Sequence, residues 1–288
     1  MNTSIDQMHY LVLQIGEAHC QGDWNYRQVC SPFTRIYYVT QGQAQVELPD
    51  RVQELRPGYL YIVPAFTPHS CICSGVFSHY YIHIYNESDD DLFGDWLLPV
   101  EIEADERVAG EVKRLCELCP GMSLRQYEPK SYDNSQTLRE STWVNKQRKM
   151  ADRIESRAIV YQLLARFVRQ AQPHPAVRDE RIVEVLHYIH AHLADKMTMA
   201  ELAEQACLSK DHLIRLFRKE MHTTPLCYIN RKRIEKAQLK LLTETTPIKE
   251  IAYQLGFEGQ AYFNRVFKQV AGISPATYRE LGLLGDRG

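Results

Sequence analysis

Four hydrogen-bonding side chains stand close together in the stretch GFEGQAYFNRVFKQVAGISPATYR, residues 256–279. They are Gln260, Asn264, Arg265 and Lys268. In a helix of 3.6 residues per turn these four share one side, and the large apolar residues between them share the other. Arg matches the two acceptors on the edge of guanine, and Asn or Gln matches the edge of adenine. The chemistry that this pattern predicts is the reading of base edges by a helix in the major groove of DNA.

The same pattern occurs a second time, 50 residues earlier. The matching segments are LIRLFRK (213–219) with FNRVFKQ (263–269), and TPLCY (224–228) with SPATY (274–278). A repeat in register predicts two similar structural units and disfavours the alternative of a plain helical bundle with a charged surface.

Each copy has the signals of a helix-turn-helix unit, over residues 198–220 and 247–271. Ser209 is positioned to cap the second helix of the first unit with its hydroxyl. Gly256 suits the left-handed turn of the second unit. A long helix over 226–242 is expected to hold the two units in a fixed relation.

The outer faces of the two second helices, called the reading helices below, supply the candidate DNA contacts. These are Lys210, Asp211, Ile214, Arg215 and Arg218 in the first, and Gln260, Ala261, Asn264, Arg265 and Lys268 in the second. An exposed Ile214 or Ala261 suits a thymine methyl group. Lys210, Arg218 and Lys268, together with Lys249 outside the reading helices, suit phosphates, which add affinity without sequence information.

The charge distribution agrees with this assignment. The chain carries a net −2, but residues 196–280 hold 14 Lys and Arg against nine Asp and Glu. Such a local basic excess is expected for a nucleic-acid-binding part of an otherwise acidic protein.

Residues 180–281 resemble the DNA-binding domain of the AraC/XylS family of transcription regulators, on the signature IKEIAYQLGFEGQAYFNRVFKQVAGISPATYR. The resemblance implies a module of seven helices with two reading helices. It places base contacts at Asp211, Ile214, Arg215, Gln260, Ala261, Asn264 and Arg265. Two residues depart from the family pattern: Asp211, where larger or neutral residues are common, and His222, where glycine usually follows the first reading helix.

The first hundred residues predict an all-β domain. Its strand-like runs are RIYYVT (35–40), AQVEL (44–48), YLYIVP (59–64) and HYYIHIY (79–85), separated by turn signals. GYLYIVPAFTPHS (58–70) resembles the second half of a cupin motif, which implies a cupin-like barrel over about residues 15–90. The pattern becomes helical over about 101–171.

The predicted organisation is therefore two-domain. Residues 1–171 form a ligand-sensing and dimerisation domain, and 172–179 form a linker because two prolines interrupt any helix there. Residues 180–288 form an all-α DNA-binding domain with a double helix-turn-helix. Met150, Ile154, Ala158, Tyr161, Ala165 and Val168 recur at helical spacing, either as core or as the seam of a homodimer.

A polar ligand pocket is expected inside the barrel. Its candidate residues are Trp24, Tyr37, His79, Tyr81 and His83, with Tyr26 and Arg35 nearby. Strand alternation puts His79, Tyr81 and His83 on one face of their strand. Aromatic and polar side chains together suit a sugar or a similar molecule. The alternative is a barrel filled by its own side chains.

No metal, cofactor or catalytic group is predicted, because SPFTRIYYVTQG lacks the His and Glu that a cupin metal site needs. The leading interpretation is a ligand-responsive transcriptional regulator rather than an enzyme. The alternatives are a cupin enzyme with an accessory DNA-binding module and a regulator controlled by a protein partner.

The expected partners are double-stranded DNA over two successive turns, a small polar effector, a second copy of the chain and, as a candidate, RNA polymerase. Apolar runs fall far short of the ~20 residues of a membrane span. The eight scattered cysteines favour reduced thiols in a cytoplasm.

Overall fold

Two compact units make up the part of the chain that the computed structural model describes, residues 8–86, 96–173 and 179–281. The first takes in the elements between residues 9 and 86 and those between 98 and 170. The second takes in those between 171 and 281 together with β9 (Trp96–Leu97), which pairs with β11 (Gln172–Pro173). Residues 1–7, 87–95, 174–178 and 282–288, including most of the predicted linker, lie outside the described residues.

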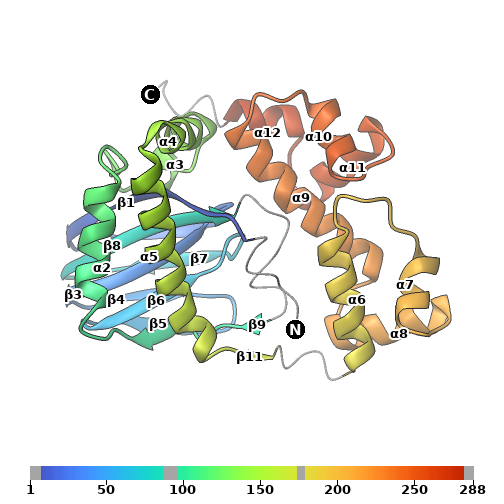
Figure 1. Cartoon of the computed structure of the whole chain (residues 1–288), viewed down its shortest axis with the longest axis horizontal. Helices are drawn as coiled ribbons and strands as arrows, with labels where there is room; N and C mark the ends of the chain where they lie inside the picture. Colours follow the sequence, from blue (N-terminus) through green and yellow to red (C-terminus); the bar gives the residue numbers. More distant parts are fainter. Residues whose placement is uncertain (1–7, 87–95, 174–178, 282–288) are drawn as a thin grey trace. The chain divides into compact units, whose positions relative to one another are not determined.

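The first unit is built on two antiparallel sheets (Figure 1). The five-stranded sheet has the order β1 (Tyr10–Gln21), β8 (Val76–Asn86), β3 (Thr34–Gly42), β6 (Tyr59–Val63) and β10 (Glu101–Glu103). The four-stranded sheet has the order β2 (Tyr26–Val29), β7 (His69–Ile72), β4 (Ala44–Glu47) and β5 (Val52–Leu55). Side chains from both sheets form one core, as is usual when two sheets pack face to face.

Four helices follow the strands: α2 (Val108–Leu118), α3 (Pro129–Tyr132), α4 (Ser135–Gln147) and α5 (Met150–Arg169). Helices α2, α4 and α5 all contact β1, and Figure 1 shows α2 and α5 lying across the five-stranded sheet. Residues 101–103 form a strand rather than the predicted start of the helical region. Ile102 pairs there with Leu60 of β6, a contact that local periodicity does not reveal.

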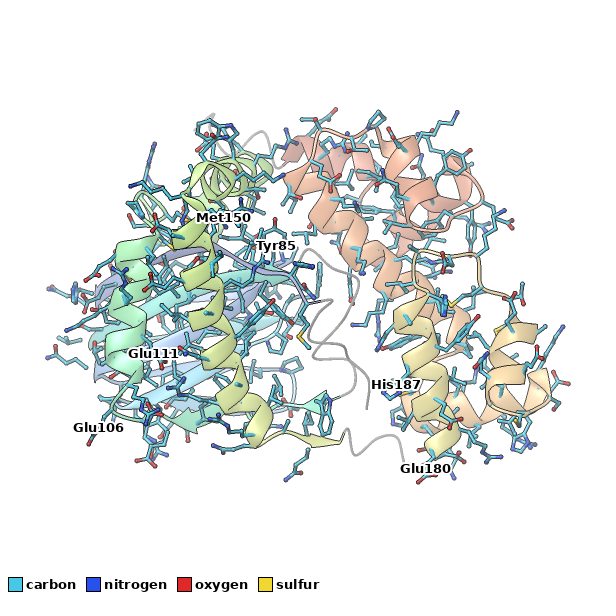
Figure 2. The ribbon with its side chains drawn as sticks, viewed as in Figure 1. Tyr85, Glu106, Glu111, Met150, Glu180 and His187 are labelled. Atoms are coloured by element: carbon cyan, nitrogen blue, oxygen red, sulfur yellow. The ribbon has the colours of Figure 1, made fainter. Side chains whose placement is uncertain are left out.

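The core face of α5 is not the predicted apolar stripe. Its buried apolar residues are Ile159, Val160, Leu163, Leu164 and Phe167. Met150 and Ile154 of the stripe are 76% and 60% exposed, so the interpretation of the stripe as core is wrong. Helix α5 has apolar residues on two neighbouring faces, and its contacts with β1 and α2 decide which one is buried. Arg166 holds α5 to α2 through Glu111, at 2.9 Å between Nη2 and Oε1. Figure 2 labels Glu111 on α2 and Met150 at the start of α5.

Between residues 179 and 281 the second unit contains α6 (Glu180–Ala191), α7 (Met199–Gln205), α8 (Lys210–Met221), α9 (Pro225–Thr243), α10 (Ile248–Gln254), α11 (Gln260–Ala271) and α12 (Pro275–Leu281). These helices enclose two separate apolar cores. The first half of α9 contributes Tyr228 and Ile229 to one core, and the second half contributes Ile234 and Leu241 to the other. Helix α9 is therefore the common support of both halves. The β-rich amino-terminal and helical carboxy-terminal folds predicted from the sequence are confirmed.

The two reading helices, α8 and α11, end in the same left-handed turn. His222 has φ 53° and Gly272 has φ 79°. The N–H of each donates to a carbonyl four residues earlier at 3.0 Å, Arg218 and Lys268 respectively. His222 thus adopts the conformation that glycine usually supplies, at a steric cost of roughly 1–2 kcal/mol.

We predict that His222→Gly raises the free energy of unfolding by about 0.5–1 kcal/mol. Glycine removes the steric strain of the left-handed turn, and this stabilisation exceeds the entropic cost of ordering a more flexible residue on folding. The matched change, Gly272→His, is expected to lower it by about 1 kcal/mol. Urea unfolding followed by circular dichroism measures both. Loss of stability in both variants would contradict the assignment of strain to His222.

Candidate nucleic-acid interface and effector domain

Helix α8 buries one side and exposes the other. Leu213, Leu216 and Phe217 are buried in the first helical core. Lys210, Asp211, Arg215 and Arg218 are exposed, and Ile214 is partly exposed. Ser209 caps the helix by accepting a hydrogen bond from the N–H of His212 at 3.4 Å. Asp211 lies in the first turn, where a carboxylate also stabilises the positive end of the helix dipole.

Helix α11 has the same division. Phe263, Val266 and Phe267 are buried, and Gln260, Ala261, Asn264, Arg265 and Lys268 are exposed. The guanidinium of Arg265 lies 5.2 Å from the ring centre of Tyr262, which orients it beside the helix. Val270, which helical spacing from Phe263, Val266 and Phe267 predicts on the buried side, is 41% exposed. It lies in the last turn, just before the chain leaves the helix at Gly272, so the helical period overestimates its burial.

Gly256 occupies the turn before α11 for two reasons. Its φ is 72°, in the left-handed region. A Cβ there would also lie 2.7 Å from Nη2 of Arg233 and 2.8 Å from the carbonyl oxygen of Ala194. The equivalent turn of the first unit uses Cys207, with φ 51°. A residue with a side chain at position 256 would therefore collide with the joint between the two halves of this unit.

Arg233 of α9 forms that joint. Its guanidinium donates to the carbonyl oxygens of Leu193 (2.9 Å), Asp195 (2.5 Å) and Gly256 (3.1 Å). The first two acceptors follow α6 and the third lies in the turn of the second helix-turn-helix, so one buried side chain links both halves. Burial lowers the pKa of Arg233. The sequence predicted that the helix over 226–242 holds the two units in a fixed relation but did not single out Arg233, which stands next to Ile234 on the buried side of α9.

Two protein-family patterns match the chain. One, described as an AraC-like ligand binding domain, matches residues 12–189, and a helix-turn-helix domain matches residues 202–281. The first alone covers more than half of the chain. The chain belongs to the AraC family of transcriptional regulators.

Its curated relatives share the carboxy-terminal third. The arabinose operon regulatory protein of Escherichia coli (strain K12) is 39% identical over 107 residues, which are 37% of this chain and 36% of that protein. Regulatory protein PocR of Salmonella typhimurium is 32% identical over 106 residues, 37% of this chain and 35% of that protein. This AraC-family chain thus spans about a third of the length of these relatives.

Solved structures show similar regions. The DNA-binding domain of AdpA, in complex with a target DNA, is 29% identical and covers 35% of this chain and 90% of that chain, with a TM-score of 0.34. Fatty-acid-bound ToxT from Vibrio cholerae is 14% identical over 94% of this chain and 95% of that chain, with a TM-score of 0.46.

None of the described helices in the AraC-family chain is both long and apolar enough to cross a membrane.

The five candidate effector residues lie together in the interior of the two-sheet first unit, which is called the barrel domain below. Trp24, Tyr37, His79, Tyr81 and His83 are all buried. The ring centre of His79 lies 5.3 Å from that of Trp24 and 5.4 Å from that of Tyr37. The hydroxyl of Tyr81 accepts a hydrogen bond from the N–H of Leu124 at 2.8 Å. These side chains therefore pack against one another and against the segment that covers them.

Burial also sets the charge of this interior. It lowers the pKa of His69 to about 4 and that of His79 to about 3, so both rings are neutral at pH 7. Arg35 nearby donates to Ser31 Oγ at 2.6 Å, and Ser31 Oγ donates to Asp133. Burial raises the pKa of Asp133 to about 6. Among the described residues, no three His, Cys, Asp or Glu side chains converge on a position that could hold a metal ion.

We predict that Arg233→Met destabilises the helical unit by about 3 kcal/mol, because three carbonyl groups lose a charged donor. Arg231→Met on the same helix is the matched control, since Arg231 is exposed, and it is expected to change stability by less than about 0.5 kcal/mol. Thermal and urea unfolding of the full chain measure both. Equal effects of the two variants would contradict the role assigned to Arg233.

Proposed function

We propose that this AraC-family protein is a sequence-specific DNA-binding regulator of transcription that responds to a small polar ligand and acts as a homodimer. The observation that carries the proposal is the pair of reading helices, each with a buried apolar side and an exposed polar side. Lys210, Arg218 and Lys268 would contact phosphates, and Gln260, Asn264 and Arg265 would contact base edges.

The relation between the two helices supports binding over two successive major grooves. Each reading helix packs in its own core, and both cores share α9. Because Arg233 fixes the joint between the two halves, the polar sides of both reading helices are already oriented before DNA binds. This lowers the entropic cost of association. The AdpA domain in complex with its target DNA is the comparison that supports DNA as the partner. RNA polymerase remains a candidate second partner, and the chain is proposed to work in the cytoplasm without enzymatic activity.

Arg265→Ala is expected to lower affinity for the target DNA by about 1–3 kcal/mol and to relax sequence preference at one base pair. Lys268→Ala is expected to weaken binding to all DNA alike and to reduce the salt dependence by about one phosphate contact. Fluorescence anisotropy with genomic fragments selected by the wild-type protein, against random DNA at several salt concentrations, measures both. If the two variants behave identically on target and random DNA, the assignment of base and phosphate contacts is wrong.

The exposed stripe of α5 supports dimerisation. It combines Met150, Ile154 and Val168 on a 20-residue helix, and apolar residues spaced in this way suit helix-to-helix packing. The core face of α5 is already used within the barrel domain, so the stripe is available to a second copy of the chain.

We predict that Ile154→Asp converts the dimer to a monomer at micromolar concentration, because a carboxylate would be buried in the seam without a partner. Val52→Asp is the matched control, as Val52 on β5 is 59% exposed and Ile154 is 60% exposed. Sedimentation equilibrium measures the oligomeric state of each. If Ile154→Asp is still a dimer, the dimer interface lies on another surface and the assignment to α5 is wrong.

A further inference from the structure

A second polar environment lies in the barrel domain, outside the aromatic interior described above. A pocket of about 430 Å³ is bounded by Gln14 of β1, by the segment 121–126, and by the first turns of α4. Helix α4 contacts β1, and Figure 1 shows α3 and α4 at one end of the first unit. None of the five candidate effector residues in the aromatic interior lines this pocket.

Gln14 is the buried floor of the pocket. It is 2% exposed, and its Oε1 atom accepts a hydrogen bond from Nδ1 of His83 at 2.7 Å. Its Nε2 atom has no hydrogen-bond partner among the described residues. A buried donor without a partner costs roughly 1–3 kcal/mol. Because this atom is itself buried, an acceptor oxygen of a bound molecule would remove the cost once the amide group turns toward the pocket.

Two further features favour an anionic acceptor. The first turn of the 13-residue helix α4 lines the pocket at Gln136 and Thr137, and a helix amino terminus attracts negative charge. Arg125 is exposed at the wall and makes no hydrogen bond or ion pair with any described residue. Together with Nε2 of Gln14, these groups form a donor set suited to a carboxylate.

The rest of the wall suits hydroxyl groups. Ser123 and Ser141 each offer a hydroxyl that can both donate and accept. The hydroxyl of Ser131 already donates to the carbonyl of Glu128 at 2.6 Å and can accept a hydrogen bond. Glu140 is a further acceptor, and it already receives a hydrogen bond from Nε2 of Gln136 at 3.2 Å. The pocket volume falls within the range of small-molecule sites.

We propose that this pocket binds a small carboxylic acid that carries several hydroxyl groups, of the sugar-acid class, and that it is the effector site of the barrel domain. The inference rests on the proposed function as a ligand-responsive regulator and specifies its ligand.

The pocket is joined to the helix that carries the proposed dimer seam. Nδ2 of Asn145, on α4, donates to the carbonyl of Val12 on β1 at 2.7 Å. Arg148 follows α4 directly and donates to Asn145 Oδ1, to the carbonyl of Asp152 and to Ser156 Oγ, each at 3.0 Å. A ligand that binds one position of α4 better than another would therefore shift the position of α5.

The test is isothermal titration of the 288-residue chain with D-gluconate, D-glucuronate and D-galacturonate, with D-sorbitol, D-glucose and D-galactose as their respective neutral counterparts. At least one acid is expected to bind at least tenfold more tightly than its neutral counterpart. Failure of all three acids to bind, or equal binding of acids and neutral compounds, overturns the proposal.

Gln14→Glu is the sharpest variant, because it keeps the acceptor for His83 and replaces the free donor by a second carboxylate oxygen. It is expected to weaken binding of the acid at least tenfold, and Gln45→Glu on β4 is the exposed control that leaves binding unchanged. If Gln14→Glu does not fold, Arg125→Ala at the exposed wall is expected to weaken binding at least threefold. Unchanged affinity in the folded pocket variants places the acid elsewhere and overturns the proposal.

DNA binding by the same variants separates the two proposals. Without acid, the pocket variants are expected to bind the selected target DNA like the wild type. If acid binding fails while target DNA is still bound, only the pocket assignment falls. If the wild-type chain binds acid but does not discriminate target from random DNA, the regulator proposal falls and the pocket stands.

Discussion

The buried guanidinium of Arg233 is the interaction on which the DNA-binding unit depends. Three carbonyl oxygens from two distant segments accept its hydrogen bonds, which offsets the cost of removing a charge from water. Gly256 is part of the same contact, because any side chain there would occupy the space of the guanidinium. The two reading helices belong to different cores, so their mutual orientation depends on α9 and on this joint.

In the barrel domain the main energetic cost is different, because its interior contains many side chains that can carry charge. Burial keeps His69, His79 and His83 neutral. The charge of Arg35 is compensated through Ser31 and Asp133, which lies next to α4. This arrangement ties the segment before α4 to the barrel and leaves a polar pocket between them. The proposed effector site thus lies where the barrel meets the helices rather than among its packed aromatic rings.

The two units also differ in how their surfaces are used. In the helical unit, the polar side of each reading helix is exposed and each apolar side is covered by the unit itself. In the barrel domain, α5 has two apolar faces and the domain covers only one of them. An exposed apolar stripe on an otherwise well-packed helix is a feature that a second copy of the chain can cover.

The sequence by itself determined the helix-turn-helix units, the exposed sides of α8 and α11, and the β-rich character of the first domain. These features depend on helical and strand periodicity, on capping residues such as Ser209, and on a repeat of 50 residues, all of which are local. Only the tertiary structure decided which face of α5 is buried, that Glu101–Glu103 joins a sheet, that Arg233 joins two cores and that Gln14 keeps a free donor beside a pocket. Each of these depends on contacts between residues far apart in the chain, and the sequence pattern around a residue does not encode which distant partner it meets.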